Sequence, residues 1–410
     1  RLDPAVIERN ARRVVRTKLR FVTREDPEQY SVERVACDAH RELARESAEA
    51  SMVLLQNEGP LLPLDPGGLR RLAVIGELAT RRNLGDRGSS MVSPRRVVTF
   101  LDGIRDRLGD GVEVLFDEGR DADAVRRTAE GADAVVVVAG RRWHEEGENL
   151  ASRRKPGKPA KVARGGDRTD LALRAAEVAM ILAAVAANPR TAVVLVGGSA
   201  ITVEAWRESV PAILMAWYPG MEGGNALARI LFGDVSPAGK LPFTIPTDPA
   251  QLPPFDPWTE RADYGYLHGY TLLDEQGAEP AFRFGFGLSY TTFTLGEPEL
   301  STAVIPPDGT VELTVQVTNS GDRVGAEVIQ VYVSFPDSGV QRPVKLLRAF
   351  EKVRLAPGET RAVPLTVQAA DLARYEPETE RWIVDPGEYQ ALVGASSAPD
   401  ALVDLPFTVT

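Results

Sequence analysis

Apolar residues follow two different spacings along the chain. Between residues 71 and 232, short runs of Val, Ile, Leu and Ala alternate with stretches of helical period, whereas after residue 291 apolar and polar residues alternate one by one. Continuous runs such as Val135-Val136-Val137-Val138 are typical of strands buried on both faces of a parallel sheet. The first region therefore predicts an α/β fold, in which a mainly parallel sheet is sandwiched by helices.

The same pattern predicts the order of the elements in this region. A basic amphipathic helix is expected over residues 1–21, and a longer helix over residues 31–55. Strands and helices then alternate. We expect strands at residues 71–76, 112–116, 132–139, 191–197 and 212–217, and helices at 99–108, 122–130, 170–187 and 224–232, with a further helix beginning at 204–207.

The second region predicts an all-β domain. Residues 311–318 alternate strictly between apolar and polar, and turns at Pro357-Gly358 and Pro386-Gly387 separate similar segments. Short strands of this kind predict a β-sandwich of about 100 residues. The expected domains are a leading tail or linker at 1–30, the α/β domain at 31–247, an ordered connector rich in proline and aromatic residues at 248–290, and the β-sandwich at 291–410.

Composition limits the classes of partner. The formal net charge is -10, and hydrophobic residues make up 43% of the chain, enough for a sizeable core. Nucleic acids and anionic membranes bind basic surfaces, so we expect neither as a partner. No apolar run has the length that spans a bilayer.

Cysteine and histidine are too few for several kinds of site. Cys37 is the only cysteine, which excludes an internal disulfide and a cysteine-based metal site, and the three histidines are far apart in the sequence. We expect no metal or organic cofactor. A single cysteine, with no leader peptide visible, favours a cytoplasmic location.

A series of motifs suggests a family. Their order along the chain is ESAEASMVLLQN at 46–57, AVIG at 73–76, GDRGSS at 85–90, WYPGMEGG at 217–224, SPAGKLP at 236–242, YGYLHGY at 264–270 and FGFGLSYTTF at 284–293. In this order they resemble the second domain of the family 3 glycoside hydrolases, chiefly β-glucosidases and β-xylosidases, followed by the junction into a fibronectin type III-like domain. The resemblance covers nearly the whole chain.

The resemblance implies a retaining glycosidase without a cofactor. In such enzymes two carboxyl groups about 5–5.5 Å apart flank the glycosidic bond; one attacks the anomeric carbon, and the other protonates the leaving oxygen and then activates water. In this family the nucleophilic aspartate belongs to a barrel domain, which we expect upstream of Arg1, with residues 1–30 as its tail or linker. The acid/base belongs to the second domain, on a loop after a strand and shortly before an Asp-Arg pair.

Three glutamates match the position of that acid/base. Strand 132–139 leads to Glu145, Glu146 and Glu148, and parallel α/β sheets place their sites at such strand ends. Glu148 is our first candidate, followed by Glu146 and then Glu145; the alternative is a solvated acidic loop neutralised by neighbouring arginines. The basic stretch at residues 153–161 makes the spacing to the Asp-Arg pair longer than the family pattern, and suggests a flap over the leaving-group side.

Other residues near the glutamates have expected supporting roles. Trp143 and His144 are candidates to line the leaving-group subsite, with core packing or exposure as the alternative. Asp167 and Arg168 are expected to support the loop structurally, as an ion pair at a helix start beside Thr169. Trp217 and Tyr218 are expected to be structural.

The resulting hypothesis is that the chain is part of an enzyme. The chain is expected to be the C-terminal part of an exo-acting β-glucosidase that releases terminal non-reducing β-D-glucosyl residues, and to be inactive without the barrel. A β-xylosidase and a non-catalytic carbohydrate-binding or assembly module are the alternatives. The expected partners are a small glycoside and the barrel domain of the same protein, and homo-oligomerisation is left open.

Overall fold

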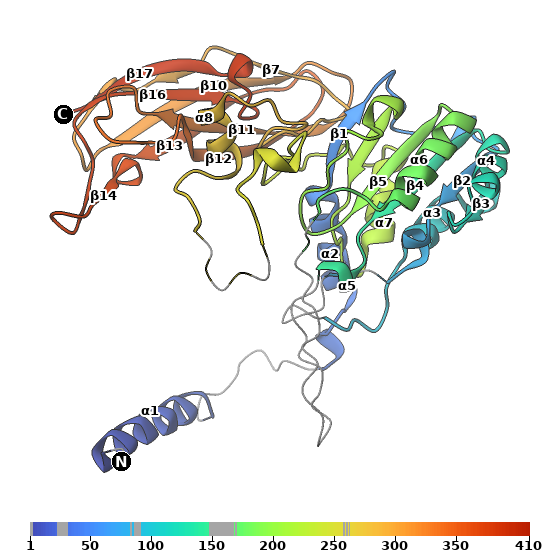
Figure 1. The fold of residues 1–410 in the computed structure, drawn as a ribbon, viewed down its shortest axis with the longest axis horizontal. Helices are drawn as coiled ribbons and strands as arrows, with labels where there is room; N and C mark the ends of the chain where they lie inside the picture. The colour runs from blue at the N-terminus through green and yellow to red at the C-terminus, as the bar shows by residue number, and fades with distance from the viewer. Residues whose placement is uncertain are drawn as a thin grey trace. The chain divides into compact units, whose positions relative to one another are not determined.

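The computed structural model describes residues 3–22, 32–82, 84–85, 92–146, 168, 170–256, 259, 261 and 263–410 (Figure 1). The chain divides into two compact units, Arg1–Glu42 and Leu43–Thr410. The first unit contains helix α1 (Pro4–Val22), a short 3-10 helix (Val32–Arg34) and the start of helix α2 (Asp38–Ser51). No helix of the described residues is long and apolar enough to cross a membrane.

A six-stranded sheet forms the centre of the second unit. Its strands lie in the order β1-β6-β5-β4-β2-β3, and all neighbours are parallel except β1 and β6. The strands are β1 (Val53–Asn57), β2 (Arg71–Ile75), β3 (Glu113–Asp117), β4 (Ala134–Gly140), β5 (Thr191–Val196) and β6 (Ala212–Met215). The predicted, mainly parallel sheet is confirmed.

Helices cover both faces of this sheet. Helices α3 (Phe100–Leu108) and α7 (Gly223–Leu231) belong to one buried apolar cluster, and α4 (Ala122–Glu130) and α6 (Ala175–Ala187) belong to the other. Successive strand residues serve opposite clusters, because side chains alternate across a strand: Val136 packs on the α3 side and Val137 on the α4 side. This two-sided burial is the reason that the strands read as continuous apolar runs.

The glycine-rich motif after β6 serves helix packing. A Cβ on Gly224 would lie 2.0 Å from the backbone oxygen of Thr99, and one on Gly103 would lie 2.1 Å from the oxygen of Gly224. Thr99 caps α3 through a capping box with Asp102. Gly103 and Gly224 are therefore explained by the close approach of α3 and α7.

The expected helix over residues 31–55 is wrong at both ends. Helix α2 begins at Asp38 and ends at Ser51, and the apolar run that follows forms the edge strand β1, antiparallel to β6. Because Val53, Leu54 and Leu55 are all buried, the run needs sheet pairing that a solvent-facing helix end would not supply. Two smaller expectations also differ: α6 begins at Ala175, and the helix expected from residue 204 is a 3-10 turn at Arg207–Ser209.

The C-terminal part is the expected β-sandwich. One sheet has the order β13-β10-β7 with β8 also paired to β10, and the other has the order β12-β11-β16-β17-β9. The strands are β7 (Phe293–Leu295), β8 (Glu299–Leu300), β9 (Val304–Ile305), β10 (Thr310–Asn319), β11 (Gly325–Ser334), β12 (Leu346–Leu355), β13 (Thr360–Gln368), β16 (Gly387–Gly394) and β17 (Val403–Val409). The inward residues of both sheets form one apolar core.

Two further elements flank the sandwich (Figure 1). Helix α8 (Gly269–Gln276) lies in the connector and contacts the sandwich through Asp274, whose carboxylate pairs with Lys345 at 2.6 Å. Strands β14 (Arg374–Glu376) and β15 (Arg381–Ile383) form a separate two-stranded hairpin.

Candidate active site

The candidate site lies where three neighbouring parallel strands end. Strands β4, β5 and β6 are adjacent in the sheet, so the loops that follow Gly140, Val196 and Met215 meet at one edge. The first loop contains the single-turn helix α5 (Trp143–Glu146). In open α/β sheets this edge is where ligands bind.

Glu146 joins the three loops. Its Oε2 accepts hydrogen bonds from the backbone N–H of Gly198 at 2.7 Å and from the hydroxyl of Tyr218 at 2.6 Å. Its Oε1 accepts one from the hydroxyl of Ser199 at 2.8 Å and lies 3.3 Å from Nε of Arg168. Only 8% of the Glu146 side chain is exposed. Both carboxylate oxygens are therefore used within the protein.

Arg168 and Tyr218 complete this network. The Arg168 guanidinium donates to Ser199 Oγ and to the backbone oxygen of Ala200, the latter at 2.6 Å. Burial lowers the pKa of Arg168, and the charge of Glu146 partly opposes that shift. Burial also raises the pKa of Tyr218, and its hydrogen bond to Glu146 raises that pKa further. Tyr218 is thus held as a neutral donor.

Glu145 has a different and local role. Its Oε2 accepts from the backbone N–H of Arg142 at 2.7 Å, and its Oε1 lies 3.4 Å from Nη1 of Arg174. Arg174 also pairs with Glu177 at 3.0 Å, and Glu177 accepts from the backbone N–H of Gly140 at 3.0 Å. Glu145 therefore stabilises the start of α5 and connects it with the start of α6.

Comparison with known proteins identifies the family. The model of the glycosyl hydrolase family 3 C-terminal domain matches residues 52–290, and that of a fibronectin type III-like domain matches residues 327–397. The chain belongs to glycosyl hydrolase family 3. The resemblance inferred from the motifs is confirmed.

Relatives of this family 3 chain include proteins named for different activities. The chain is 36% identical over 390 residues to a β-xylosidase of Formosa agariphila, a match that covers 91% of this chain and 50% of the relative. It is 41% identical over 367 residues to a β-glucosidase of Rhizobium radiobacter, a match that covers 80% of this chain and 42% of the relative. The chain thus spans about half the length of the relatives it matches.

A solved structure supports the fold. The crystal structure of a family 3 β-glucosidase from Bifidobacterium adolescentis matches with a TM-score of 0.83 and 32% identity, covering all of this chain and 58% of that one. At this similarity the α/β domain and the fibronectin type III-like sandwich together are a family 3 arrangement.

The predicted site residues of the family 3 chain divide into two groups. Glu145, Glu146 and Arg168 are described and make the contacts given above, whereas Glu148, Asp167, Thr169 and the basic stretch at 153–161 lie outside the described residues. Trp143 and His144 belong to α5, and their side chains are also outside the description. Within the described part of the chain, no group of three or more His, Cys, Asp or Glu could hold a metal ion.

The sequence pattern predicts no role for two partners of Glu146, Gly198 and Ser199, and only a general structural role for a third, Tyr218. Gly198 and Ser199 follow β5, which pairs with β4, and Tyr218 follows β6, which pairs with β5. That position was the available signal, since residues after adjacent parallel strands meet at one edge of the sheet.

Trp217 is structural. Its Nε1 donates to the backbone oxygen of Ser51 at 2.8 Å, and its ring packs edge-on against Phe243 with 5.5 Å between centroids. Its backbone φ of 58° lies in the left-handed region, which is rare for a bulky residue. The contacts to Ser51 and Phe243 hold this conformation, and they direct the chain so that the next residue, Tyr218, meets Glu146.

Proposed function

We propose that this chain is the C-terminal part of a retaining, exo-acting β-glucosidase and supplies the general acid/base, Glu148. The reaction is hydrolysis of terminal non-reducing β-D-glucosyl residues by double displacement, with the nucleophilic aspartate on a barrel that precedes this chain in the full protein. Membership of family 3 and similarity to relatives named as β-glucosidases support the reaction class.

The hydrogen bonds of Glu146 are the observation that supports choosing Glu148 as the acid/base. A general acid needs an oxygen within hydrogen-bond reach of the leaving group. Glu146 has four donors around its two oxygens and is almost fully buried, so no free face is left for a glycosidic oxygen. Glu145 is engaged with Arg142 and Arg174. Glu148, two residues beyond α5, is the remaining candidate of the three.

In this proposal Glu146 is a positioning residue. It holds α5 against the ends of β5 and β6, and the segment that carries Glu148 starts from this anchored helix. In the first step Glu148 would protonate the departing oxygen while the barrel aspartate attacks the anomeric carbon. In the second step the Glu148 carboxylate would take a proton from water, which then attacks the glycosyl-enzyme.

Leaving-group dependence tests this assignment. In the full-length protein, Glu148→Gln should reduce kcat/KM for cellobiose by about 10²–10⁴-fold, because its poor leaving group needs protonation. With p-nitrophenyl β-D-glucoside the first step needs no acid, because nitrophenolate is a good leaving group. A burst of nitrophenol should therefore be seen before a slow steady-state turnover. Glu145→Gln serves as the control and should show no such contrast. If Glu148→Gln lowered kcat/KM by the same factor for cellobiose and for p-nitrophenyl β-D-glucoside, the assignment would be refuted.

A β-xylosidase is the second candidate. The match to the Formosa agariphila β-xylosidase, at 36% identity, favours it. The comparison of p-nitrophenyl β-D-xyloside with the glucoside on the wild-type protein decides between the two: kcat/KM is higher for the glucoside under the main proposal.

A further inference from the structure

The fibronectin type III-like domain carries a cleft that no part of the proposed catalysis uses. Its volume is about 600 Å³, within the range of ligand sites of about 300–1,000 Å³. Three segments line it: the stretch before α8, the start of β12 with the loop that precedes it, and the hairpin β14–β15. Its principal side chains are Tyr266, Arg342, Arg348, Arg374, Tyr375 and Trp382.

Aromatic rings stand exposed at this cleft. Trp382 is 72% exposed, and Tyr266 and Tyr375 are also exposed. Tyr375 and Trp382 lie directly opposite each other across the hairpin, with ring centroids 5.6 Å apart. Grouped large aromatic residues on a surface mark interaction sites, whereas single exposed apolar residues need no explanation.

The polar side chains of the cleft are held in place. Arg374 pairs with Asp385 at 2.7 Å and with Glu376 at 2.6 Å. Arg342 donates to the backbone oxygen of Leu372 at 2.7 Å. The Nε donors of Arg342 and Arg348 are buried and have no hydrogen-bond partner in the described part of the chain. Guanidinium groups held by these contacts therefore lie beside the aromatic rings in the lining of the cleft.

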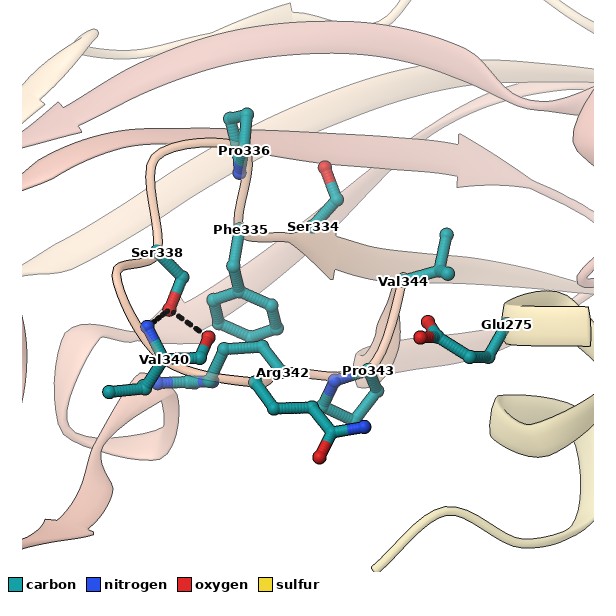
Figure 2. A pocket seen from close by; sticks show the side chains of 10 residues that line it. Glu275, Ser334, Phe335, Pro336, Ser338, Val340, Arg342, Pro343 and Val344 are labelled. Atoms are coloured by element: carbon teal, nitrogen blue, oxygen red, sulfur yellow. Dashed lines mark hydrogen bonds between the residues drawn. The ribbon is translucent and has the colours of Figure 1, made fainter.

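A second cleft, of about 400 Å³, adjoins the first through Val340, Gln341 and Arg342 (Figure 2). Figure 2 shows the Arg342 guanidinium lying against the ring of Phe335, at 3.8 Å from its centroid. The hydroxyl of Ser338 donates to the backbone oxygen of Val340 at 2.9 Å and braces the same loop. The two clefts share this internally supported loop, and together they are called the groove.

We propose that this groove binds an extended β-glucan chain, as a carbohydrate site on the fibronectin type III-like domain. Sugar rings present C–H faces, which stack on aromatic side chains, and hydroxyl groups, which accept from guanidinium donors. The lining of the groove contains both kinds of side chain. The inference rests on the proposed function, because an exo-acting glucosidase gains from holding the interior of a chain whose end it hydrolyses.

Affinity electrophoresis of the full-length protein tests the groove. A soluble β-glucan of high molecular mass is the probe, because it has few chain ends and so engages an exo-acting catalytic site little. The wild type should be retarded, and Trp382→Ala should bind at least about tenfold more weakly, as expected for loss of a central aromatic anchor. Trp382→Tyr should retain binding, and Phe350→Ala, which removes an exposed ring outside the cleft, should migrate as the wild type.

Two results would overturn the groove proposal: a wild type that is not retarded, and a Trp382→Ala protein retarded as strongly as the wild type. Circular dichroism checks folding, and Tyr375→Ala provides a second variant if Trp382→Ala does not fold. Hydrolysis of p-nitrophenyl β-D-glucoside is measured in parallel. Retardation without hydrolysis would refute the proposed function but not the groove proposal. Hydrolysis without retardation would refute the groove proposal but not the proposed function.

Discussion

The hydroxyl of Tyr218 donates to Oε2 of Glu146 at 2.6 Å, and this contact joins the loops that follow β6 and β4. Gly198 and Ser199 add the loop after β5 to the same carboxylate. The three strand ends are therefore fastened to each other by one side chain. Glu146 is therefore part of the framework of this edge of the sheet.

Glu146→Gln should destabilise the protein by about 2–4 kcal/mol, because the amide cannot accept from all four donors and leaves buried partners unsatisfied. The measurement is chemical denaturation followed by circular dichroism. The control is Glu204→Gln, which alters a partly exposed pair with Arg207 at 3.1 Å and should cost under about 1 kcal/mol. Equal effects of the two substitutions would contradict the role of Glu146.

Stability should fall at alkaline pH in part through Tyr218. Burial and the bond to Glu146 raise its pKa above the ordinary value of about 10, so the folded state keeps a proton that the unfolded state releases. The stabilisation is complete below about pH 10 and is lost as the pH rises further. The free energy of unfolding, measured across this range, should decline less steeply in Tyr218→Phe. A decline as steep as in the wild type would disprove the contribution.

Gly224→Ala should cost about 3 kcal/mol or more, because the new Cβ would lie 2.0 Å from the Thr99 backbone oxygen and force α3 and α7 apart. Gly111→Ala is the matched control, since no atom lies within 4 Å of its added Cβ. Its unfolding midpoint should stay near that of the wild type. Comparable thermal midpoints for both variants would show that the close approach is not required.

Lys345→Met should destabilise the protein by about 3–5 kcal/mol, because it leaves the buried Asp274 carboxylate without its main partner. The Lys345 and Asp274 side chains are 3% and 7% exposed, and Arg283 is 3.9 Å from Asp274. For comparison, Asp263→Asn breaks a pair with Arg261 whose side chains are 84% and 85% exposed, and should change stability by under about 1 kcal/mol. Denaturation curves that coincide for the two variants would contradict this contrast.

Periodicity in the sequence predicts the parallel sheet of the α/β part and the strands of the C-terminal β-sandwich. The run Val135-Val136-Val137-Val138 and the alternation at 311–318 identify their strands because burial on two faces and on one face leave different patterns. The same reasoning failed at β1. Its apolar run continues a helical pattern without a break, and only pairing with β6, distant in the sequence, makes it a strand.

The candidate site was predictable in place but not in detail. A parallel strand that ends in a glutamate-rich loop indicates the edge of the sheet where the candidate site lies. The sequence alone does not separate Glu145 from Glu146, because the burial of Glu146 depends on Gly198, Ser199 and Tyr218, which follow other strands. The distinction arises from tertiary contacts that leave no local signal.

Azide rescue in the full-length protein tests the central proposal most directly. Glu148→Ala is incubated with p-nitrophenyl β-D-glucoside and azide, Glu146→Ala is treated in parallel, and the sugar product is identified by nuclear magnetic resonance. We predict that azide restores turnover of Glu148→Ala and yields β-glucosyl azide, since the small anion replaces water that no longer has a base. Glu146→Ala should show no rescue. Rescue of Glu146→Ala, with none for Glu148→Ala, would contradict the assignment of both residues.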